Sequence, residues 1–260
     1  MNKLGDAMKG AYPDLAYRFQ HVMAVAAAQR SEKIERNGWP DECECDLCGD
    51  TGIDPERERF CTCDPGRAKR LHHELSAKWV EVCPARYVDC RIETHPDQEA
   101  AQAVRKWVDE GFKQRRNLVL SGPVGTGKSG LALGAMYEIH MQGIGCKFGT
   151  FSQILDQLRP RNDDDKAAKR ENLDNLTRLG LLVIDDLGTH KESEWTAEQL
   201  FDLINGRTSN ARPFIITTNW TAKEMAAALD DRLMSRLVEA TDVVPVVGPD
   251  LRRKQRGVAA

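Results

Sequence analysis

The clearest chemical signal in the sequence is an eight-residue run suited to holding a phosphate chain. Residues 122–129 read GPVGTGKS, which fits the pattern G-x-x-x-x-G-K-[ST]. Glycines in such a run let backbone N–H groups curve around a phosphate, and the helix that follows adds the positive end of its dipole. We expect Lys128 to reach the β- and γ-phosphates of ATP and Ser129 to bind Mg²⁺; a glycine-rich strand-to-helix turn is the alternative. The residues expected to contact ATP or ADP here are Gly122, Pro123, Val124, Gly125, Thr126, Gly127, Lys128, Ser129 and Gly130.

Two adjacent carboxylates end an apolar stretch further along the chain. Residues 181–184 read LLVI, and Asp185 and Asp186 follow them. Beside a phosphate-binding loop, one carboxylate at a strand end holds Mg²⁺ through water, and another orients or deprotonates the attacking water. We expect Asp185 to serve the metal and Asp186 the water. The alternative, an aspartate that caps a following helix, explains the pair equally well in isolation, but the phosphate loop upstream favours hydrolysis.

A further apolar stretch, residues 213–218, leads to an amide side chain, Asn219. An amide beside the two carboxylates can contact the γ-phosphate or the attacking water, and we expect Asn219 to do so. Taken by itself, an asparagine that starts a loop would be the better explanation. Its position after the Asp185–Asp186 stretch favours the functional role.

Two arginines lie four residues apart in residues 231–237, which read DRLMSRL. On a helix this spacing puts Arg232 and Arg236 on one face. Arginine can neutralise the charge that develops on a phosphoryl group during transfer, from the same subunit or from a neighbour. A solvated basic face with a salt bridge to Asp231 is the alternative. Arg252 is a weaker candidate for a last phosphate contact, and a basic tail would also explain it.

Five of the eight cysteines crowd into residues 43–63, with a spacing typical of a structural zinc site. Cys45 and Cys48 form a C-x-x-C-G turn, and Cys61 and Cys63 supply a second pair. Four thiolates complete a tetrahedral Zn²⁺ site, and clustered cysteines in a reduced compartment more often hold a metal than form disulfides. An iron–sulfur cluster or a redox dithiol is the alternative. The possible substitute ligands are Cys43, His72 and His73.

A nucleic-acid surface is the least marked of the candidate sites. The formal net charge is −3, so any contact with nucleic acid must come from a local basic patch. Phe148 or Phe151 could stack on a base. The basic residues that would then meet phosphates are Lys147, Arg159 and Arg161. Aromatic residues at the end of a strand more often belong to the core, and that interpretation is favoured here.

These residues need a scaffold, and the apolar runs predict a parallel sheet. The expected strands are 118–120, 147–150, 181–184 and 214–218. Short apolar strands separated by helical stretches indicate an α/β fold whose sheet is covered by helices on both faces. Helices are expected at residues 97–112, from about residue 128 and at 151–161, and residues 160–171 predict a charged surface excursion.

The N-terminal part of the chain is organised differently. A helix over residues 15–36, turns over 41–67 and a bridging helix over 68–80 are expected. With 260 residues, 41% of them hydrophobic and 30% charged, the chain can bury one large core beside a smaller appendage. Its longest apolar run, residues 22–28, is too short to span a membrane, so we expect neither a secreted nor a membrane protein.

Together these motifs resemble AAA+ ATPases of the DnaC/DnaI helicase-loader group, particularly its phage-type members, over residues 41–252. The resemblance rests on CDLCGDTG followed by CTC, on CPARY, and on GPVGTGKS, VIDDLG, TTN and DRLMSRL. It implies a P-loop fold with a truncated lid, because about two dozen residues follow Arg236. It also implies that Arg86 and Tyr87 border the adenine, that Arg236 is an arginine finger, and that Asn219 and Arg252 act as sensors.

The resemblance further implies an ATPase that loads a hexameric replicative helicase onto single-stranded DNA at the initiation of replication. We expect residues 1–40 to bind the partner, 41–75 to form the zinc module, and 76–260 to form an ATPase domain that self-associates. Hydrolysis is expected to be slow and stimulated by DNA or partner, in the cytoplasm of a bacterium or phage-infected host, with no membrane contact. Two alternatives stay open: an IstB-like transposition helper ATPase, whose N-terminal region normally lacks a cysteine cluster, and a zinc-bearing adaptor that uses nucleotide only as a switch.

Overall fold

The computed structural model describes residues 53–54, 59–61, 64–159, 166–188, 193–238 and 240–252. The chain divides into two compact units, Met1–Lys78 and Trp79–Ala260. The helix expected at residues 15–36 lies outside the described residues. That helix and the three expected domain limits therefore remain predictions.

In the first unit, two short strands precede a long helix, whose last four residues belong to the second unit. Strand β1 (Ile53–Asp54) pairs antiparallel with β2 (Arg59–Phe60). Helix α3 (Asp64–Val82) begins earlier and ends later than the expected bridging helix. Its first turn packs closely on the segment before it, since a Cβ atom at Gly66 would lie 2.0 Å from the Cys61 carbonyl oxygen.

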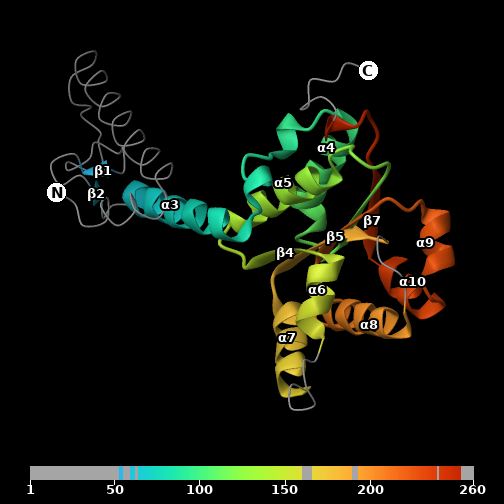
Figure 1. The fold of residues 1–260 in the computed structure, drawn as a ribbon. Coiled ribbons are helices and arrows are strands. Elements are labelled where there is room, and N and C mark those ends of the chain that lie inside the picture. Colours follow the sequence, from blue (N-terminus) through green and yellow to red (C-terminus); the bar gives the residue numbers. More distant parts are fainter. Residues whose placement is uncertain are drawn as a thin grey trace. The chain divides into compact units, whose positions relative to one another are not determined.

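The second unit is built on a five-stranded parallel sheet (Figure 1). Its strands are β3 (Asn117–Ser121), β4 (Cys146–Thr150), β5 (Leu181–Leu187), β6 (Phe214–Thr218) and β7 (Thr241–Pro245). They lie in the order β4-β5-β6-β3-β7, and every neighbouring pair is parallel. The expected α/β class and the four expected strands are confirmed.

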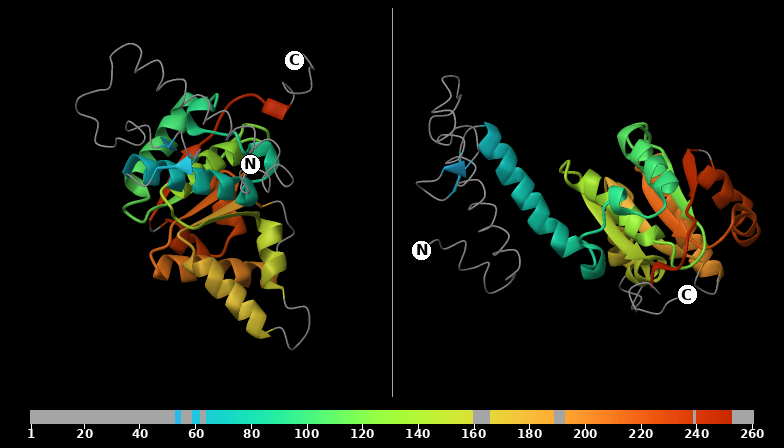
Figure 2. Two further views of the ribbon diagram at one scale, coloured as in Figure 1. Left: turned by 90° about the vertical axis from the view of Figure 1, so that its left-hand side faces the viewer. Right: turned by 90° about the horizontal axis from the view of Figure 1, so that it is seen from above.

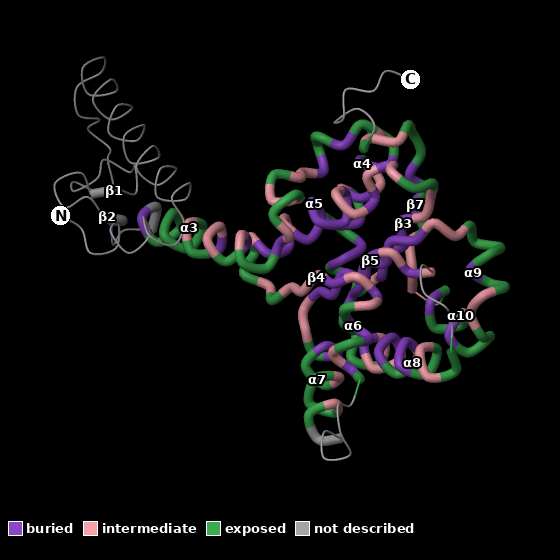
Figure 3. The backbone as a smooth tube through the Cα atoms, in the orientation of Figure 1, coloured by how far each residue is buried: buried purple, intermediate pink, exposed green. Residues whose placement is uncertain are grey.

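Helices cover both faces of this sheet (Figures 1 and 2). The helical elements are η1 (Ala85–Tyr87), η2 (Ile92–Thr94), α4 (Gln98–Lys106), η3 (Trp107–Gly111), α5 (Lys128–His140), α6 (Phe151–Leu158), α7 (Lys166–Arg178), α8 (Glu194–Ser209), α9 (Ala222–Ala228) and α10 (Asp231–Val238). Leu118 and Leu120 pack with α4 and α5 in one core, whereas Val119 packs with α6, α8 and α10 in the other. This alternation follows the two-residue period of a strand, and it leaves the three central strands β3, β5 and β6 buried on both faces (Figure 3). Within the described part of the chain, no helix has the length and apolar character required to cross a bilayer.

The strand order decides where the polar strand ends meet. Strand β6 lies between β5 and β3, so the carboxyl ends of these three parallel strands are adjacent. The phosphate loop follows β3, Asp185 and Asp186 lie near the end of β5, and Asn219 follows β6. Ligands of open parallel sheets bind at this edge.

Three elements differ from the sequence-based expectations. The helix expected at 97–112 changes to a π-helix at Trp107, where the Phe112 N–H donates to the Trp107 carbonyl at 2.7 Å; this wider turn keeps both aromatic side chains buried. Part of the expected surface excursion forms α7, and α6 ends at Leu158. Strand β7 was not expected, because it is an edge strand that ends in Pro245, and a proline in an apolar run argues against a strand.

Candidate nucleotide-binding site

The phosphate loop connects β3 to α5 and depends on glycine at two points. Gly125 and Gly127 have φ values of 85° and 93°, in the left-handed region that side chains disfavour. A Cβ atom at Gly125 would lie 2.1 Å from Oδ1 of Asp250, and one at Gly127 would lie 2.7 Å from Nε2 of His95. The loop is therefore shaped by its own backbone and by two segments that approach it closely.

Lys128 is the first residue of α5, and its side chain is only 6% exposed. Its Nζ donates to the carbonyl oxygens of Gly122 at 2.8 Å and Pro123 at 2.7 Å, and to Oδ1 of Asn219 at 2.8 Å. Burial lowers the pKa of Lys128, while the charges of Asp186 and Asp185 act in the opposite direction. The structure thus brings Lys128 and Asn219 together, as the sequence predicted.

Asp185 is buried beneath the loop, where two hydroxyl groups contact its carboxylate. Thr217 Oγ1 donates to its Oδ1 at 2.6 Å, and the Ser129 hydroxyl forms a further hydrogen bond with it. Burial raises the pKa of Asp185, and these two hydrogen bonds partly offset that rise. The Ser129 hydroxyl at the start of α5 and the Asp185 carboxylate of β5 therefore lie within hydrogen-bonding distance of each other.

Asp186 points into the cavity from an unusual backbone position. Its φ is 58°, a left-handed conformation that aspartate tolerates better than most residues. Its backbone N–H donates to Thr217 Oγ1 at 3.0 Å. The consequence is that adjacent aspartates separate: Asp185 is buried against Thr217, whereas Asp186 lines the cavity.

These groups surround a cavity of about 280 Å³ between the loop and residues 86–96. Among its lining residues are Arg86, Tyr87, Thr94, Lys128, Ser129, Asp186, Asn219 and Arg252. Tyr87 reaches the start of α5, because its hydroxyl hydrogen-bonds with Ser129, and burial raises the pKa of Tyr87. The Arg86 guanidinium lies 4.3 Å from the Tyr87 ring centre and also donates to its hydroxyl. The residues expected beside the adenine therefore do line this cavity.

His95, which the motifs did not identify, links residues 86–96 to the loop. Its Nδ1 accepts from the Asp97 N–H at 3.2 Å, and its Nε2 lies 3.1 Å from the Thr126 carbonyl oxygen. Because a carbonyl oxygen can only accept, the contact with Thr126 is one in which His95 Nε2 donates to the loop. No spacing pattern connects His95 with Thr126, so sequence inspection offered no signal for this contact.

The chain after β7 returns to the loop and holds Arg252 at the cavity. The Val247 N–H donates to Oδ2 of Asp97 at 2.8 Å, and the Leu251 N–H donates to the Gly125 carbonyl at 2.9 Å. Oδ1 of Asp97 meanwhile accepts from the N–H of Ala100 at 3.1 Å as the N-cap of α4. This segment brings Arg252 into the lining of the cavity.

Arg236 lies outside the set of described residues that line the cavity. It is exposed on α10, while Leu233 and Leu237 of the same helix are buried. Arg232, one turn earlier, lies 5.2 Å from the Phe201 ring centre and forms an ion pair with Asp230 at 3.5 Å.

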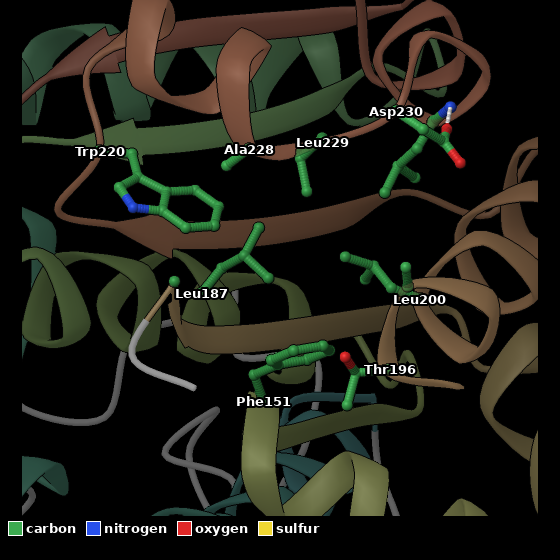
Figure 4. A pocket seen from close by; sticks show the side chains of 11 residues that line it. Phe151, Leu187, Thr196, Leu200, Trp220, Ala228, Leu229 and Asp230 are labelled. Carbon is green, nitrogen blue, oxygen red and sulfur yellow. Dashed lines mark hydrogen bonds between the residues drawn. The ribbon is translucent and has the colours of Figure 1, made fainter. Parts of the chain in front are cut away.

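A small apolar pocket of about 40 Å³ separates α10 from the strand ends (Figure 4). Leu187 and Trp220 in its wall directly follow Asp186 and Asn219 in the chain. Leu229 and Leu233 complete the wall from the α10 side. The same two strands therefore present polar residues to the cavity and apolar residues to the helix that carries Arg236.

Most of the cysteines predicted to bind zinc lie outside the described residues. Cys45, Cys48 and Cys63 lie outside the described residues, as do Cys43 and Arg161. Only Cys61 of the predicted ligands has a described burial, and it is buried. The described residues contain no cluster of three or more metal-ligating side chains, so zinc remains a prediction.

The aromatic residues of the expected nucleic-acid surface belong to the core. Phe151 is buried, and Phe148 packs against the core on the α5 side of the sheet. The Lys147 ammonium donates to Gln157 Oε1 at 2.5 Å, and Arg159 lies 5.3 Å from the Trp195 ring centre. The core interpretation favoured from the sequence agrees with this packing.

Known proteins share both the sequence and the fold of this chain. The replicative helicase loader DnaC of Escherichia coli is 27% identical over 147 residues, which cover 56% of this chain and 60% of that protein. An ATP-binding protein in an insertion sequence of Mycobacterium tuberculosis is 25% identical over 159 residues, 59% of this chain and 61% of that protein. The similarity thus spans about 60% of the length of these relatives.

The crystal structure of the DnaC helicase loader superposes with a TM-score of 0.56 at 24% identity, covering 63% of this chain and 100% of that one. The likeness concerns the fold, which is that of an AAA+ P-loop protein. Residues 86–259, more than half of the chain, match the family described as IstB-like ATP binding protein. The site-lining loop, the paired aspartates and Asn219 all fall inside that match, and the chain belongs to the IstB-like ATP-binding protein family.

Proposed function

We propose that the protein is an ATPase that loads a hexameric replicative helicase onto single-stranded DNA. The observation that carries the ATPase part is the cavity in which Lys128, Asp186 and Asn219 converge beside Ser129. The loader part is supported by the similarity to the E. coli protein named as a replicative helicase loader. The coarser statement, an AAA+ ATP-binding protein of replication or transposition, rests on the family and its relatives.

The groups in the cavity fit a nucleoside triphosphate with Mg²⁺. The Lys128 ammonium donates hydrogen bonds to three neutral acceptors, two backbone carbonyls and one amide oxygen. A phosphate oxygen, which carries a negative charge, can replace them. Ser129 and Asp185 offer a hydroxyl and a carboxylate, the oxygen donors that Mg²⁺ prefers. Ser129 and Asp185 would hold the ion, which would offset charge on the β- and γ-phosphates.

The chain's own residues then account for hydrolysis. Asp186 accepts a hydrogen bond from a water molecule and takes its proton as the water oxygen bonds to the γ-phosphorus. The bond between that phosphorus and the β–γ bridging oxygen breaks, so ADP and phosphate are released. Asn219, at the end of the neighbouring strand, orients the γ-phosphate or the water. Lys128 stabilises the negative charge on the transferred phosphoryl group.

The exposed position of Arg236 fits a role in a neighbouring subunit. Within one chain the site holds Lys128 and Arg252, but Arg236 is an exposed residue of α10 that does not line the cavity. We assign Arg236 to the nucleotide of an adjacent copy, which makes self-association part of the proposed function. Residues 1–40 are assigned to the helicase, the zinc module follows them, and the protein acts in the cytoplasm without a membrane partner.

A second candidate function is supported by the relatives found in insertion sequences. A transposition helper ATPase would use the same cavity, and the M. tuberculosis relative is an ATP-binding protein of such an element. The predicted cysteine cluster favours the helicase loader, because the transposition type normally lacks it. A zinc-bearing adaptor would bind nucleotide without turnover.

One experiment separates the three functions. The full chain, immobilised with ATP and then with ADP, is offered the host's replicative helicase and the transposase of an insertion sequence. Retention of the helicase with ATP, together with release of phosphate, supports the loader. Retention of the transposase instead supports the second candidate, and retention of either partner without any ATP turnover supports the adaptor.

A further inference from the structure

Two neighbouring threonines of β6 are equally buried but make different contacts. Thr217 and Thr218 both have 0% exposure. The Thr217 hydroxyl donates its single proton to Oδ1 of Asp185 at 2.6 Å and accepts the N–H of Asp186 at 3.0 Å. Its distance to the carboxylate is that of a charge-assisted hydrogen bond. One side chain therefore contacts both members of the aspartate pair.

The pairing of β5 with β6 is interrupted opposite Thr217, and the Thr217 side chain supplies a hydrogen-bond acceptor at that interruption. The pairing of β5 with β6 runs through Ile184 and Ile216 and resumes at Leu187 and Thr218. Two residues of β5 thus face the single residue Thr217, which is a β-bulge, and the regular ladder is interrupted there. At this point the Asp186 N–H donates to the Thr217 side chain.

The bulge also decides where the second carboxylate lies. In an unbroken strand, adjacent side chains point to opposite faces of the sheet. Here Asp186 has a φ of 58° and lines the cavity, Asp185 is buried beside Ser129, and the charges of both carboxylates act on Lys128. The Thr217 hydroxyl contacts both residues of the bulge.

The geometry points to Thr217 as a positioning residue for ATP hydrolysis: its hydroxyl orients the Asp185 carboxylate towards Ser129 and holds the Asp186 backbone in the bulge. This inference rests on the proposed ATPase function. Since Asn219 follows Thr217 by two residues on the same strand, β6 fixes the metal-side carboxylate, the water-side carboxylate and the amide together. Removal of the hydroxyl should therefore affect Mg²⁺-dependent steps and spare the nucleotide contacts of the loop.

The adjacent threonine provides a matched control. The Thr218 hydroxyl donates to the Leu187 carbonyl at 2.8 Å and accepts the Trp220 N–H at 3.1 Å. It is as buried as Thr217 and makes the same number of such bonds in the same strand. Replacement by valine preserves the shape of each side chain and removes two hydrogen bonds in each case.

The experiment uses full-length Thr217→Val, Thr218→Val and Thr217→Ser. Binding of fluorescent mant-ATP is titrated in EDTA and at increasing Mg²⁺, and phosphate release and thermal unfolding are measured on the same samples. We expect Thr217→Val to need about 10- to 100-fold more Mg²⁺ for half-maximal enhancement of binding, with a similar fall in kcat. Its affinity in EDTA should equal that of the wild type, and Thr217→Ser should restore the Mg²⁺ midpoint. Thr218→Val should keep the wild-type midpoint despite a comparable loss of stability.

Each outcome bears on a specific claim. Equal Mg²⁺ midpoints for Thr217→Val and the wild type, with intact nucleotide binding, would overturn the positioning role and leave the ATPase proposal standing. Equal shifts in both valine variants would also overturn it, because they would indicate general damage to β6. A wild type that binds no mant-ATP would instead overturn the proposed function. If Thr217→Val does not fold, Thr217→Ala supports the same comparison, since it removes the hydroxyl without adding atoms.

Discussion

Lys128 is the residue whose surroundings say most about the ligand of the cavity. Its ammonium is held by two loop carbonyls and by Asn219, so the loop and the β6 strand end are joined through one side chain. Burial lowers its pKa, and the charges of the two aspartates oppose that effect. A buried ammonium gains most from a partner with full negative charge. At the residue scale, the site is therefore prepared for a phosphate.

Asp186 combines a chemical role with a conformational requirement. Asparagine also tolerates the left-handed region, so Asp186→Asn should keep the backbone while it removes the proton acceptor. We expect kcat for ATP hydrolysis to fall about 10²- to 10⁴-fold, with little change in mant-ATP affinity. Phosphate release and a fluorescence titration measure the two quantities. Wild-type turnover in Asp186→Asn would assign water activation to another group.

A second substitution separates the backbone requirement from the chemistry. Asp186→Val should lose turnover to the same extent and also lose about 1–3 kcal/mol of stability, because a β-branched residue disfavours a φ of 58°. Denaturant unfolding of the two variants provides the comparison. The φ of 58° at residue 186 also accounts for an aspartate at this position, since a longer side chain adapts less readily to a left-handed backbone.

Among the elements, the segment after β7 has the most direct influence on the phosphate loop. It passes close to Gly125 and donates a backbone hydrogen bond to that residue's carbonyl. It also carries Arg252 to the cavity. The contact combines this main-chain hydrogen bond with the side chain of Asp250, which lies against Gly125.

Gly125→Ala tests this packing, and Gly143→Ala is its matched control. Both glycines have left-handed backbones, with φ values of 85° and 81°, but a Cβ at Gly143 meets nothing within 4 Å. We expect each substitution to cost about 1–2 kcal/mol from the backbone alone. Only Gly125→Ala should also weaken mant-ATP binding, because its Cβ displaces Asp250 and with it Arg252. Equal nucleotide affinity in the two variants would contradict a role for this segment in binding.

Asp97 joins the start of α4 to the same segment, and its titration should be visible in stability. Burial raises its pKa, but hydrogen bonds from the N–H groups of Val247 and Ala100 outweigh that effect, so the pKa lies below its ordinary value. A depressed carboxyl pKa stabilises the fold above the unfolded pKa of about 3.9, and this contribution is lost as pH falls through the folded value.

Asp97→Asn should therefore be less stable than the wild type at pH 7 by about 1 kcal/mol, since one of its two N–H partners then faces an amide NH₂ group. The difference should shrink as pH falls from about 5 towards 2, where the wild-type carboxyl also becomes protonated. Urea unfolding across this range measures it. A difference that stays constant with pH would show that the charge on Asp97 does not contribute.

At the scale of the whole molecule, the site needs a second copy if Arg236 acts as proposed. Arg236→Ala should bind ATP normally and lose about 10³-fold or more in turnover. Mixing it with Lys128→Ala, which has a defective cavity but an intact Arg236, should restore part of the activity in mixed assemblies. Arg232→Ala is the control, because it removes an exposed arginine one turn earlier on the same helix. Full activity of Arg236→Ala alone would show that Arg236 has no part in ATP hydrolysis.

The first unit makes a separate prediction about metal content. Protein purified under reducing conditions should contain about one equivalent of zinc, and Cys48→Ser should lose it. Cys146→Ser is a suitable control, because burial raises the pKa of Cys146 to about 12 and its sulfur donates to the Ile144 carbonyl in the second unit. An iron–sulfur absorption band, or metal-free protein, would contradict the assignment.

The phosphate loop, the paired aspartates and four of the five strands could be predicted from the sequence because each depends on contiguous residues. A loop of glycines before a lysine sets its own backbone, and an apolar run of strand length identifies a buried strand without knowledge of its neighbours. Even the meeting of Asp186 and Asn219 with Lys128 follows from one general property of parallel sheets, whose carboxyl ends share an edge.

Only the tertiary structure decided which residues hold those groups in place. The hydroxyl of Thr217 is 32 positions from Asp185, His95 is 31 from Thr126, and Val247 is 150 from Asp97. Tertiary structure also decided the position of strand β7 and the bulge at Asp186. Strand order and register bring these residues together, and both result from the packing of the whole core, so no local pattern in the sequence records them.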